Sequence, residues 1–133
     1  MKVLVVDDSE SVKLLLNHYL CQYGYDALFA SNGTEGLDMA RIHKPDLIIS
    51  DILMPVMDGF GFLKALRGDA DIMHIPFIFF SGSDTNEETI NLANSLGADG
   101  FVEKSNDFKY FSENLANILK EIADRKGQTR KKP

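Results

Sequence analysis

The sequence predicts an α/β fold, in which a parallel β-sheet carries helices on both faces. Short apolar stretches typical of buried strands alternate five times with stretches whose apolar residues recur at helical spacing. Acidic, hydroxyl and basic residues directly follow several of these apolar stretches, as expected where parallel strands end at a common crevice. A length of 133 residues fits one domain of this kind.

Composition and charge narrow the possible functions. The hydrophobic fraction of 44% and the charged fraction of 26% are typical of a globular protein. The net charge of −6 argues against a nucleic-acid-binding surface on the body of the domain. Basic residues are concentrated in residues 125–133, which contain no acid. The preceding body is therefore more acidic than the total charge suggests.

The chain carries a single cysteine, Cys21, so no disulfide can form within it. This fits the reducing conditions of the cytoplasm, where we expect the protein to be located. Cys21 falls in a helical pattern, which predicts a small packed residue rather than a nucleophile. No apolar stretch approaches the roughly 20 residues that span a membrane, and no signal peptide is visible.

The first predicted strand is valine-rich and spans residues 2–6. Asp7, Asp8 and Ser9 follow it as turn and helix-start residues. The helix that they begin ends at Gly24. Its predicted apolar face comprises Val12, Leu15, Leu16, Tyr19, Leu20 and Tyr23.

A second, shorter strand is predicted over residues 26–30, followed by a turn at Asn32 and Gly33. A helix over residues 34–43 comes next. Its inward residues are Leu37 and Ala40.

The third predicted strand, residues 47–50, is a continuous apolar run that ends at Asp51. Pro45 and Pro55 bound it on either side. A carboxylate is costly inside an apolar core unless it has a partner. We therefore expect Asp51 at the carboxyl end of a buried strand, facing a crevice.

The chain continues with a loop at 54–59 and a helix whose inward residues are Phe62, Leu63 and Leu66. A polar, turn-rich segment leads into a fully apolar strand at 77–80, which is predicted to be central and is followed by Ser81.

The last third of the sequence predicts a helix over 86–96 and a short strand over 101–103 that ends in Lys104. A final helix is predicted over 107–124, with Leu115, Ile118, Leu119 and Ile122 inward together with Phe108 and Phe111. Residues 124–133 are predicted to be a basic flexible tail or the start of a linker. A solvated terminus is its simplest interpretation, and contact with an acidic partner or nucleic acid is the alternative.

Five side chains are predicted to reach the same edge of the sheet: Asp7, Asp8, Asp51, Ser81 and Lys104. Clustered carboxylates repel one another and raise at least one pKa unless a cation joins them. Mg²⁺ prefers such oxygen ligands. A carboxylate such as Asp51 can also attack phosphorus and form an aspartyl-phosphate, whose charge Lys104 and Ser81 would help to neutralise.

Three of these residues have simpler alternatives. Asp8 could cap the first helix, Lys104 could be a solvated charge, and Ser81 could be a turn residue. Asp51 is harder to explain this way, because an acid that closes so apolar a strand is unusual.

Four segments of the chain resemble the receiver domain of bacterial two-component response regulators, over roughly residues 1–123. They are VLVVDDS at 3–9, PDLIISDILMPVMDG at 45–59, FSG at 80–82 and GADGFVEK at 97–104. Each short segment is a weak signal, but the long second segment and the shared order make the match specific.

The resemblance implies a flavodoxin-like (βα)5 fold, a doubly wound parallel sheet with strand order 2-1-3-4-5. It implies that Asp51 is the phosphoacceptor and that Asp7 and Asp8 are the acidic pair that holds Mg²⁺, for which Mn²⁺ is a possible substitute. The backbone carbonyl of Leu53 matches the third protein ligand.

The resemblance also identifies Ser81 as the switch hydroxyl, Lys104 as the family lysine, and Phe101 as the aromatic residue that changes rotamer on phosphorylation. The family commonly has proline after the lysine, often with a cis peptide, whereas this chain has Ser105. A cis bond before serine would cost about 2.5–4 kcal/mol, so we expect a trans Lys104–Ser105 peptide.

By resemblance, the chain is expected to act in a phosphorelay and to take its phosphoryl group from a histidine kinase or a histidine phosphotransfer protein. Phosphorylation would change the face formed by the fourth helix, fifth strand and fifth helix, where an output partner or a second copy would dock. Neither a membrane nor nucleic acid is an expected partner of this domain. We expect a stand-alone receiver or a receiver cut from a longer regulator, not an enzyme that turns over a separate substrate.

Two other functions stay open. One is an interaction module with this fold that is not phosphorylated. The other is a phosphohydrolase with an aspartyl nucleophile, although such enzymes usually carry a second acid two residues later, where this chain has Leu53.

Overall fold

The computed structural model describes residues 1–82, 86–104 and 108–131, with the side chains of 108–112 and 125–131 excluded. It contains one parallel sheet of five strands in the order β2-β1-β3-β4-β5. The strands are β1 (Lys2–Val6), β2 (Asp26–Ala30), β3 (Leu47–Ser50), β4 (Phe77–Ser81) and β5 (Gly100–Glu103). The helices are α1 (Glu10–Gln22), α2 (Gly33–His43), α3 (Gly59–Arg67), α4 (Glu87–Ser95) and α5 (Phe108–Lys131). The predicted α/β fold, doubly wound sheet and strand order are confirmed.

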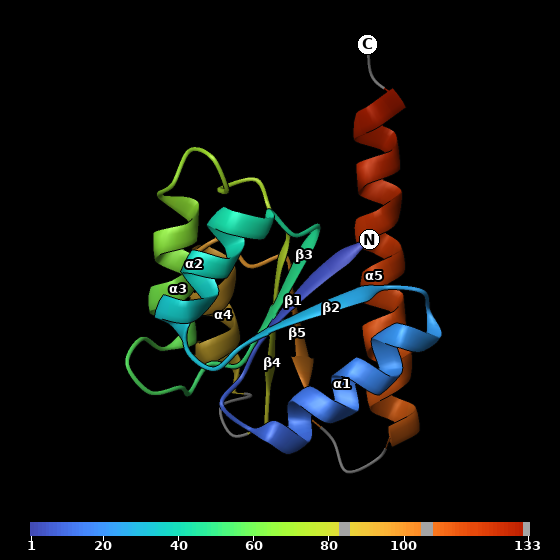
Figure 1. Ribbon diagram of the computed structural model, residues 1–133, viewed down its shortest axis with the longest axis horizontal. Coiled ribbons are helices and arrows are strands. Elements are labelled where there is room, and N and C mark those ends of the chain that lie inside the picture. The colour runs from blue at the N-terminus through green and yellow to red at the C-terminus, as the bar shows by residue number, and fades with distance from the viewer. Residues whose placement is uncertain (83–85, 105–107, 132–133) are drawn as a thin grey trace.

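The helices form two layers that enclose the sheet, with α1 and α5 on one face and α2, α3 and α4 on the other (Figure 1). Alternation along the strands divides the core accordingly. In β1, Val3 and Val5 pack with the α1 and α5 side chains, whereas Leu4 and Val6 pack with α2 and α3. Both faces of the central strands are buried, which explains their continuous apolar runs.

Strand register brings the carboxyl ends of the strands to one edge. Val6 of β1 is paired with Ser50 of β3, so the next residues, Asp7 and Asp51, leave the sheet side by side. Ser81 of β4 is paired with Glu103 of β5, so Lys104 also leaves at this edge. The topology therefore gathers residues that lie far apart in the sequence.

The α1 helix differs from its predicted apolar face at two positions. Leu15 is 39% exposed and Tyr23 is 53% exposed, whereas Leu16, Tyr19 and Leu20 are buried. Tyr23 is the C-cap residue of α1, where it stacks on Tyr25 with 6.4 Å between ring centroids. The prediction that Cys21 is packed was also wrong, because this residue is exposed.

The C-terminal helix is longer than predicted. It continues to Lys131 instead of ending at Asp124. The added segment lacks proline and is rich in arginine and lysine, which have good helix propensity. Flexibility of residues 124–133 stays a prediction, and the Lys104–Ser105 peptide lies outside the described residues. None of the described helices is long and apolar enough to cross a membrane.

Gly59 fixes the approach of α3 to the end of β3, and its replacement tests this packing. A Cβ at Gly59 would lie 2.8 Å from the Phe79 ring and 2.9 Å from Ile52 Cα, and would clash with the Asp51 carbonyl. We expect Gly59→Ala to lower the free energy of unfolding by about 2 kcal/mol or more, measured by urea denaturation.

Gly68→Ala is the matched control, because the nearest atom to its added Cβ would be 3.5 Å away and its φ is −86°. This variant should be neutral or more stable by about 0.5 kcal/mol. Equal destabilisation of the two variants would contradict the packing argument.

Candidate functional site

Three carboxylates meet at the carboxyl edge of the sheet. One oxygen from each of Asp7, Asp8 and Asp51 lies within 4.8 Å of the others. Asp7 is 2% exposed and Asp51 is 9% exposed, whereas Asp8 is exposed. The backbone N–H of Asp51 donates to the Val6 carbonyl at 2.9 Å, which holds the two strand ends together. The structure thus brings together the three acids that the sequence predicts at this edge.

Lys104 supplies positive charge to this cluster. Its Nζ lies 3.0 Å from Asp7 Oδ2 and 3.2 Å from Asp51 Oδ2. The backbone N–H of Lys104 donates to the Ser81 carbonyl at 2.9 Å, which fixes the start of its side chain beside β4. The ammonium therefore bridges carboxylates from β1 and β3, and the prediction that Lys104 lies at this edge is confirmed.

The surroundings of the Asp51 carboxyl disfavour its ionised form. Burial raises its pKa above the ordinary value, and the negative charge of Asp7 raises it further. Lys104 and the backbone N–H of Ile52, which donates to Asp51 Oδ1 at 2.8 Å, partly offset this rise. The ionised carboxylate is consequently short of positive charge, a deficit that a bound cation would relieve.

The hydroxyl of Ser81 lies at the end of β4, fully buried. Its Oγ has no hydrogen-bond partner among the described residues. A buried polar atom without a partner costs free energy, and such atoms are uncommon in folded proteins. Ser81 is therefore a free donor at the same sheet edge as the acids, as expected if an additional oxygen acceptor binds there.

Two other predicted residues, Leu53 and Phe101, lie in the loop after β3 and in β5. Leu53, two residues after Asp51, is 55% exposed. The Phe101 side chain is half-buried, and its ring centroid lies 6.2 Å from that of Phe79. The roles of Leu53 as a carbonyl ligand and of Phe101 as a switch aromatic stay predictions.

Sequence reasoning missed several groups that shape the site. The Ile52 N–H that holds Asp51 Oδ1 is a backbone donor, which no residue pattern reveals. Asp58 caps α3 through a 2.8 Å bond from the Gly61 N–H to its Oδ1. An acid just before a helical pattern is a recognised N-cap signal, so the role of Asp58 was accessible from the sequence.

The donor set defines the chemistry open to the site. Three carboxylates that converge on one point suit a hard divalent cation such as Mg²⁺, which takes one or two carboxylates and keeps several waters. An ammonium and a buried hydroxyl at the same edge can neutralise an anionic group attached to Asp51. The residues present therefore fit Mg²⁺ together with a phosphoryl group.

Comparison with known proteins agrees with this geometry. Residues 3–116 match the family described as "Response regulator receiver domain". The chain is 39% identical over 103 residues to the Bacillus subtilis "Alkaline phosphatase synthesis transcriptional regulatory protein PhoP", covering 77% of this chain and 42% of that protein. It is 31% identical over 122 residues to the "Probable transcriptional regulator ycf27" of Porphyridium aerugineum, covering 91% and 49%. The chain spans about half the length of these curated relatives.

Solved structures are also similar to this chain, in both fold and sequence. The Vibrio cholerae chemotaxis protein CheY4 is 35% identical, with a TM-score of 0.80 and coverage of 91% of this chain and 97% of that chain. The signal receiver domain of a signal transduction histidine kinase from Syntrophus aciditrophicus is 32% identical, with a TM-score of 0.79 and coverage of 91% and 88%. Fold, acidic cluster and sequence therefore agree, and this chain belongs to the response regulator receiver domain family of two-component signalling.

Proposed function

We propose that this chain is a phosphorylation-controlled switch in which Asp51 accepts a phosphoryl group from the phosphohistidine of a histidine kinase or phosphotransfer protein. One observation carries the proposal. The Lys104 ammonium contacts both Asp7 and Asp51, at the edge of the sheet where a buried Ser81 hydroxyl has no described partner. This edge holds a nucleophile, a cation and a spare hydrogen-bond donor, as phosphoryl transfer to a carboxylate requires.

Asp7, Asp8 and Asp51 would hold Mg²⁺, or Mn²⁺ in its place, with the backbone carbonyl of Leu53 as a further ligand. The convergence of the three carboxylates supports this assignment. When bound, the ion supplies positive charge to the phosphoryl oxygens.

In the proposed transfer, one Asp51 carboxylate oxygen forms a bond to phosphorus while the phosphorus–nitrogen bond to the donor histidine breaks. The imidazole leaves with the bonding electron pair. Lys104 then moves from the carboxylate to the phosphoryl oxygens, and Ser81 donates its hydrogen bond to one of them.

The phosphorylated form would differ from the free form in the packing behind Ser81. As the hydroxyl moves toward the phosphoryl group, it vacates space into which Phe101 turns. This changes the α4–β5–α5 face, which would dock an output partner or a second copy. A few kcal/mol of differential contact is enough to invert such a two-state population.

This chain would act as a cytoplasmic switch that phosphorylates and dephosphorylates itself, not as an enzyme on a separate substrate. The proposed partners are the phosphodonor and the output protein. A receiver-fold interaction module that is never phosphorylated is the competing function. It predicts that Mg²⁺-dependent beryllofluoride binding is absent from the wild-type protein.

The phosphoacceptor can be tested directly with acetyl phosphate and Mg²⁺. The wild-type protein should gain one phosphoryl group, measured by intact-protein mass spectrometry. Asp51→Asn should gain none, because an amide is not a nucleophile toward phosphorus. The exposed Asp71→Asn is the control and should label like the wild type. Label that persists on Asp51→Asn would refute the assignment.

The free energy of unfolding should depend on pH through the ionisation of Asp51. Because the folded-state pKa is raised, the folded protein holds this proton more tightly, and ionisation opposes folding. The stability contribution of Asp51 therefore falls as pH rises from its ordinary pKa through the raised value. In chelator at neutral pH, Asp51→Asn should be more stable than the wild type in urea denaturation, and this difference should shrink as pH falls through the raised pKa of Asp51 and be lost below about pH 4.

Mg²⁺ should reverse that order. At a concentration of 100 times the dissociation constant it would stabilise the wild type by about 2.7 kcal/mol. Asp51→Asn should gain much less, because one carboxylate ligand is lost. If Asp51→Asn were less stable than the wild type in chelator at neutral pH, the claim that ionisation of Asp51 opposes folding would be contradicted.

The lifetime of the phosphoryl group should depend on Leu53. This exposed side chain, two residues after Asp51, cannot orient a water for attack. We expect slow autodephosphorylation in Mg²⁺, measured as the loss of label over time. Leu53→Asn should speed the loss by roughly tenfold through orientation of water, whereas Leu53→Met should leave it unchanged. A wild-type half-life of seconds would be inconsistent with this role.

A further inference from the structure

We propose that the groove between α1 and β2 binds an extended peptide segment of a partner protein, with one apolar side chain flanked by basic residues. The segment adds as a strand to the outer edge of β2. The argument uses the edge of the sheet, the cavity beside it and the charge around that cavity. None of these depends on phosphorylation of Asp51.

The edge of β2 offers main-chain hydrogen bonds. No other described strand lies outside β2 in the sheet. The Asp26 N–H donates to the Met1 carbonyl, and the Ala30 carbonyl accepts from Asp7, so these residues face β1. Because backbone direction alternates along a strand, the N–H and C=O groups of Ala27 and Phe29 point to the outer edge. Such a free edge is a template for an added strand.

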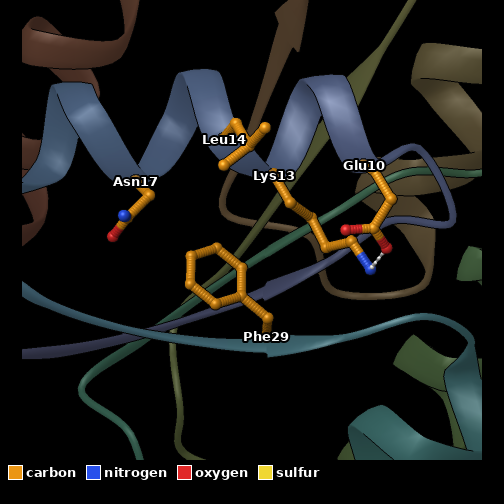
Figure 2. A pocket seen from close by; sticks show the side chains of 5 residues that line it. All are labelled: Glu10, Lys13, Leu14, Asn17 and Phe29. Atoms are coloured by element: carbon orange, nitrogen blue, oxygen red, sulfur yellow. Dashed lines mark ion pairs between the residues drawn. The ribbon is translucent and has the colours of Figure 1, made fainter.

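A cavity of about 180 Å³ lies beside this edge, between α1 and β2. Figure 2 shows the Phe29 ring below the part of α1 that carries Leu14, with Asn17 at one end of the cavity and the Lys13–Glu10 pair at the other. Leu14 is 68% exposed, although it forms one wall. A cavity of about 150 Å³ can hold a benzene-sized group. The space therefore fits one leucine or phenylalanine side chain.

Charge at the Glu10 end favours a basic segment. The Lys13 ammonium is nearly buried and already satisfied by Glu10 Oε1 at 2.8 Å and Ser31 Oγ at 3.0 Å. The Glu10 side chain is 83% exposed, so it can accept a second cation from solvent. The chain as a whole carries a charge of −6. A lysine or arginine on the peptide would therefore be attracted to this end of the groove.

A peptide suits the groove better than a second copy of the chain. β2 has five residues, of which Ala27 and Phe29 face outward, so it pairs with a short segment. A second copy would place the same exposed Glu10 and the same net negative charge against this surface. Like charges oppose that pairing, whereas a basic peptide relieves them.

The test is an NMR titration of the ¹⁵N-labelled full chain with three synthetic peptides, acetyl-Lys-Thr-X-Thr-Lys-amide, in which X is leucine, valine or phenylalanine. At least one should shift the amide signals of Ala27 and Phe29 and of the α1 residues around Leu14. Leu14→Gln, which removes the apolar wall without adding charge, should weaken binding at least tenfold. Leu92→Gln, which changes an exposed leucine on α4, should not.

Two further peptides separate the parts of the proposal. Backbone N-methylation of the best peptide should abolish binding if the segment adds as a strand. Replacement of both lysines by glutamate should weaken it, and Glu10→Gln should reduce this charge preference. Circular dichroism of each variant shows whether the fold is retained.

Absence of shifts with all three peptides would overturn the proposal, as would binding that Leu14→Gln leaves intact. Concentration-dependent self-association of the free chain that Leu14→Gln abolishes would also overturn it, in favour of a second copy. Labelling by acetyl phosphate is measured on the same samples. Failure of that labelling would affect the proposed switch but not this groove.

Discussion

Mutual repulsion of the carboxylates at the carboxyl edge of the sheet is the constraint that the site depends on. Asp7 and Asp51 are nearly buried and lie within reach of Asp8. Among the described residues, Lys104 is the cation that contacts this cluster. Lys104 directly follows β5, and its ammonium lies 5.5 Å from the centroid of the Phe80 ring in β4. The order β3-β4-β5 thus brings Lys104, which follows β5, within reach of the carboxylates that follow β1 and β3.

Burial disfavours the ionised carboxylates of the site, but it also strengthens their interaction with cations. A low-dielectric environment strengthens the attraction of Asp51 for Lys104 and for any bound cation. Ser81 is fully buried without a described partner, so its hydroxyl gains a hydrogen bond when an acceptor arrives at this edge. The free protein therefore lacks the stabilisation of this hydrogen bond, which it gains when an acceptor binds. That difference between states is what a ligand-driven switch requires.

The sequence was most informative where burial decides the structure. The bounds of the buried strands β1 and β3 match their prediction, because apolar runs bounded by turn residues leave little freedom. Reasoning failed where exposure decides, as for Leu15 and Tyr23 on α1. It also could not find Val56, which adopts a φ of +70° in the loop after Asp51. Nothing in a valine predicts that conformation, which the surrounding loop must impose.

The acidic site and the α1–β2 groove share the first turn of α1. The Ser9 N–H donates to Asp7 Oδ1 at 2.9 Å, and the Ser9 side chain caps the helix in which Glu10 and Lys13 lie. A ligand at one site alters affinity at the other only if it favours one arrangement of this turn. A cation bound at Asp7 would meet this condition only if it changed the hydrogen bond between the Ser9 N–H and Asp7 Oδ1. By reciprocity, a segment held in the groove would then change cation affinity by the same factor.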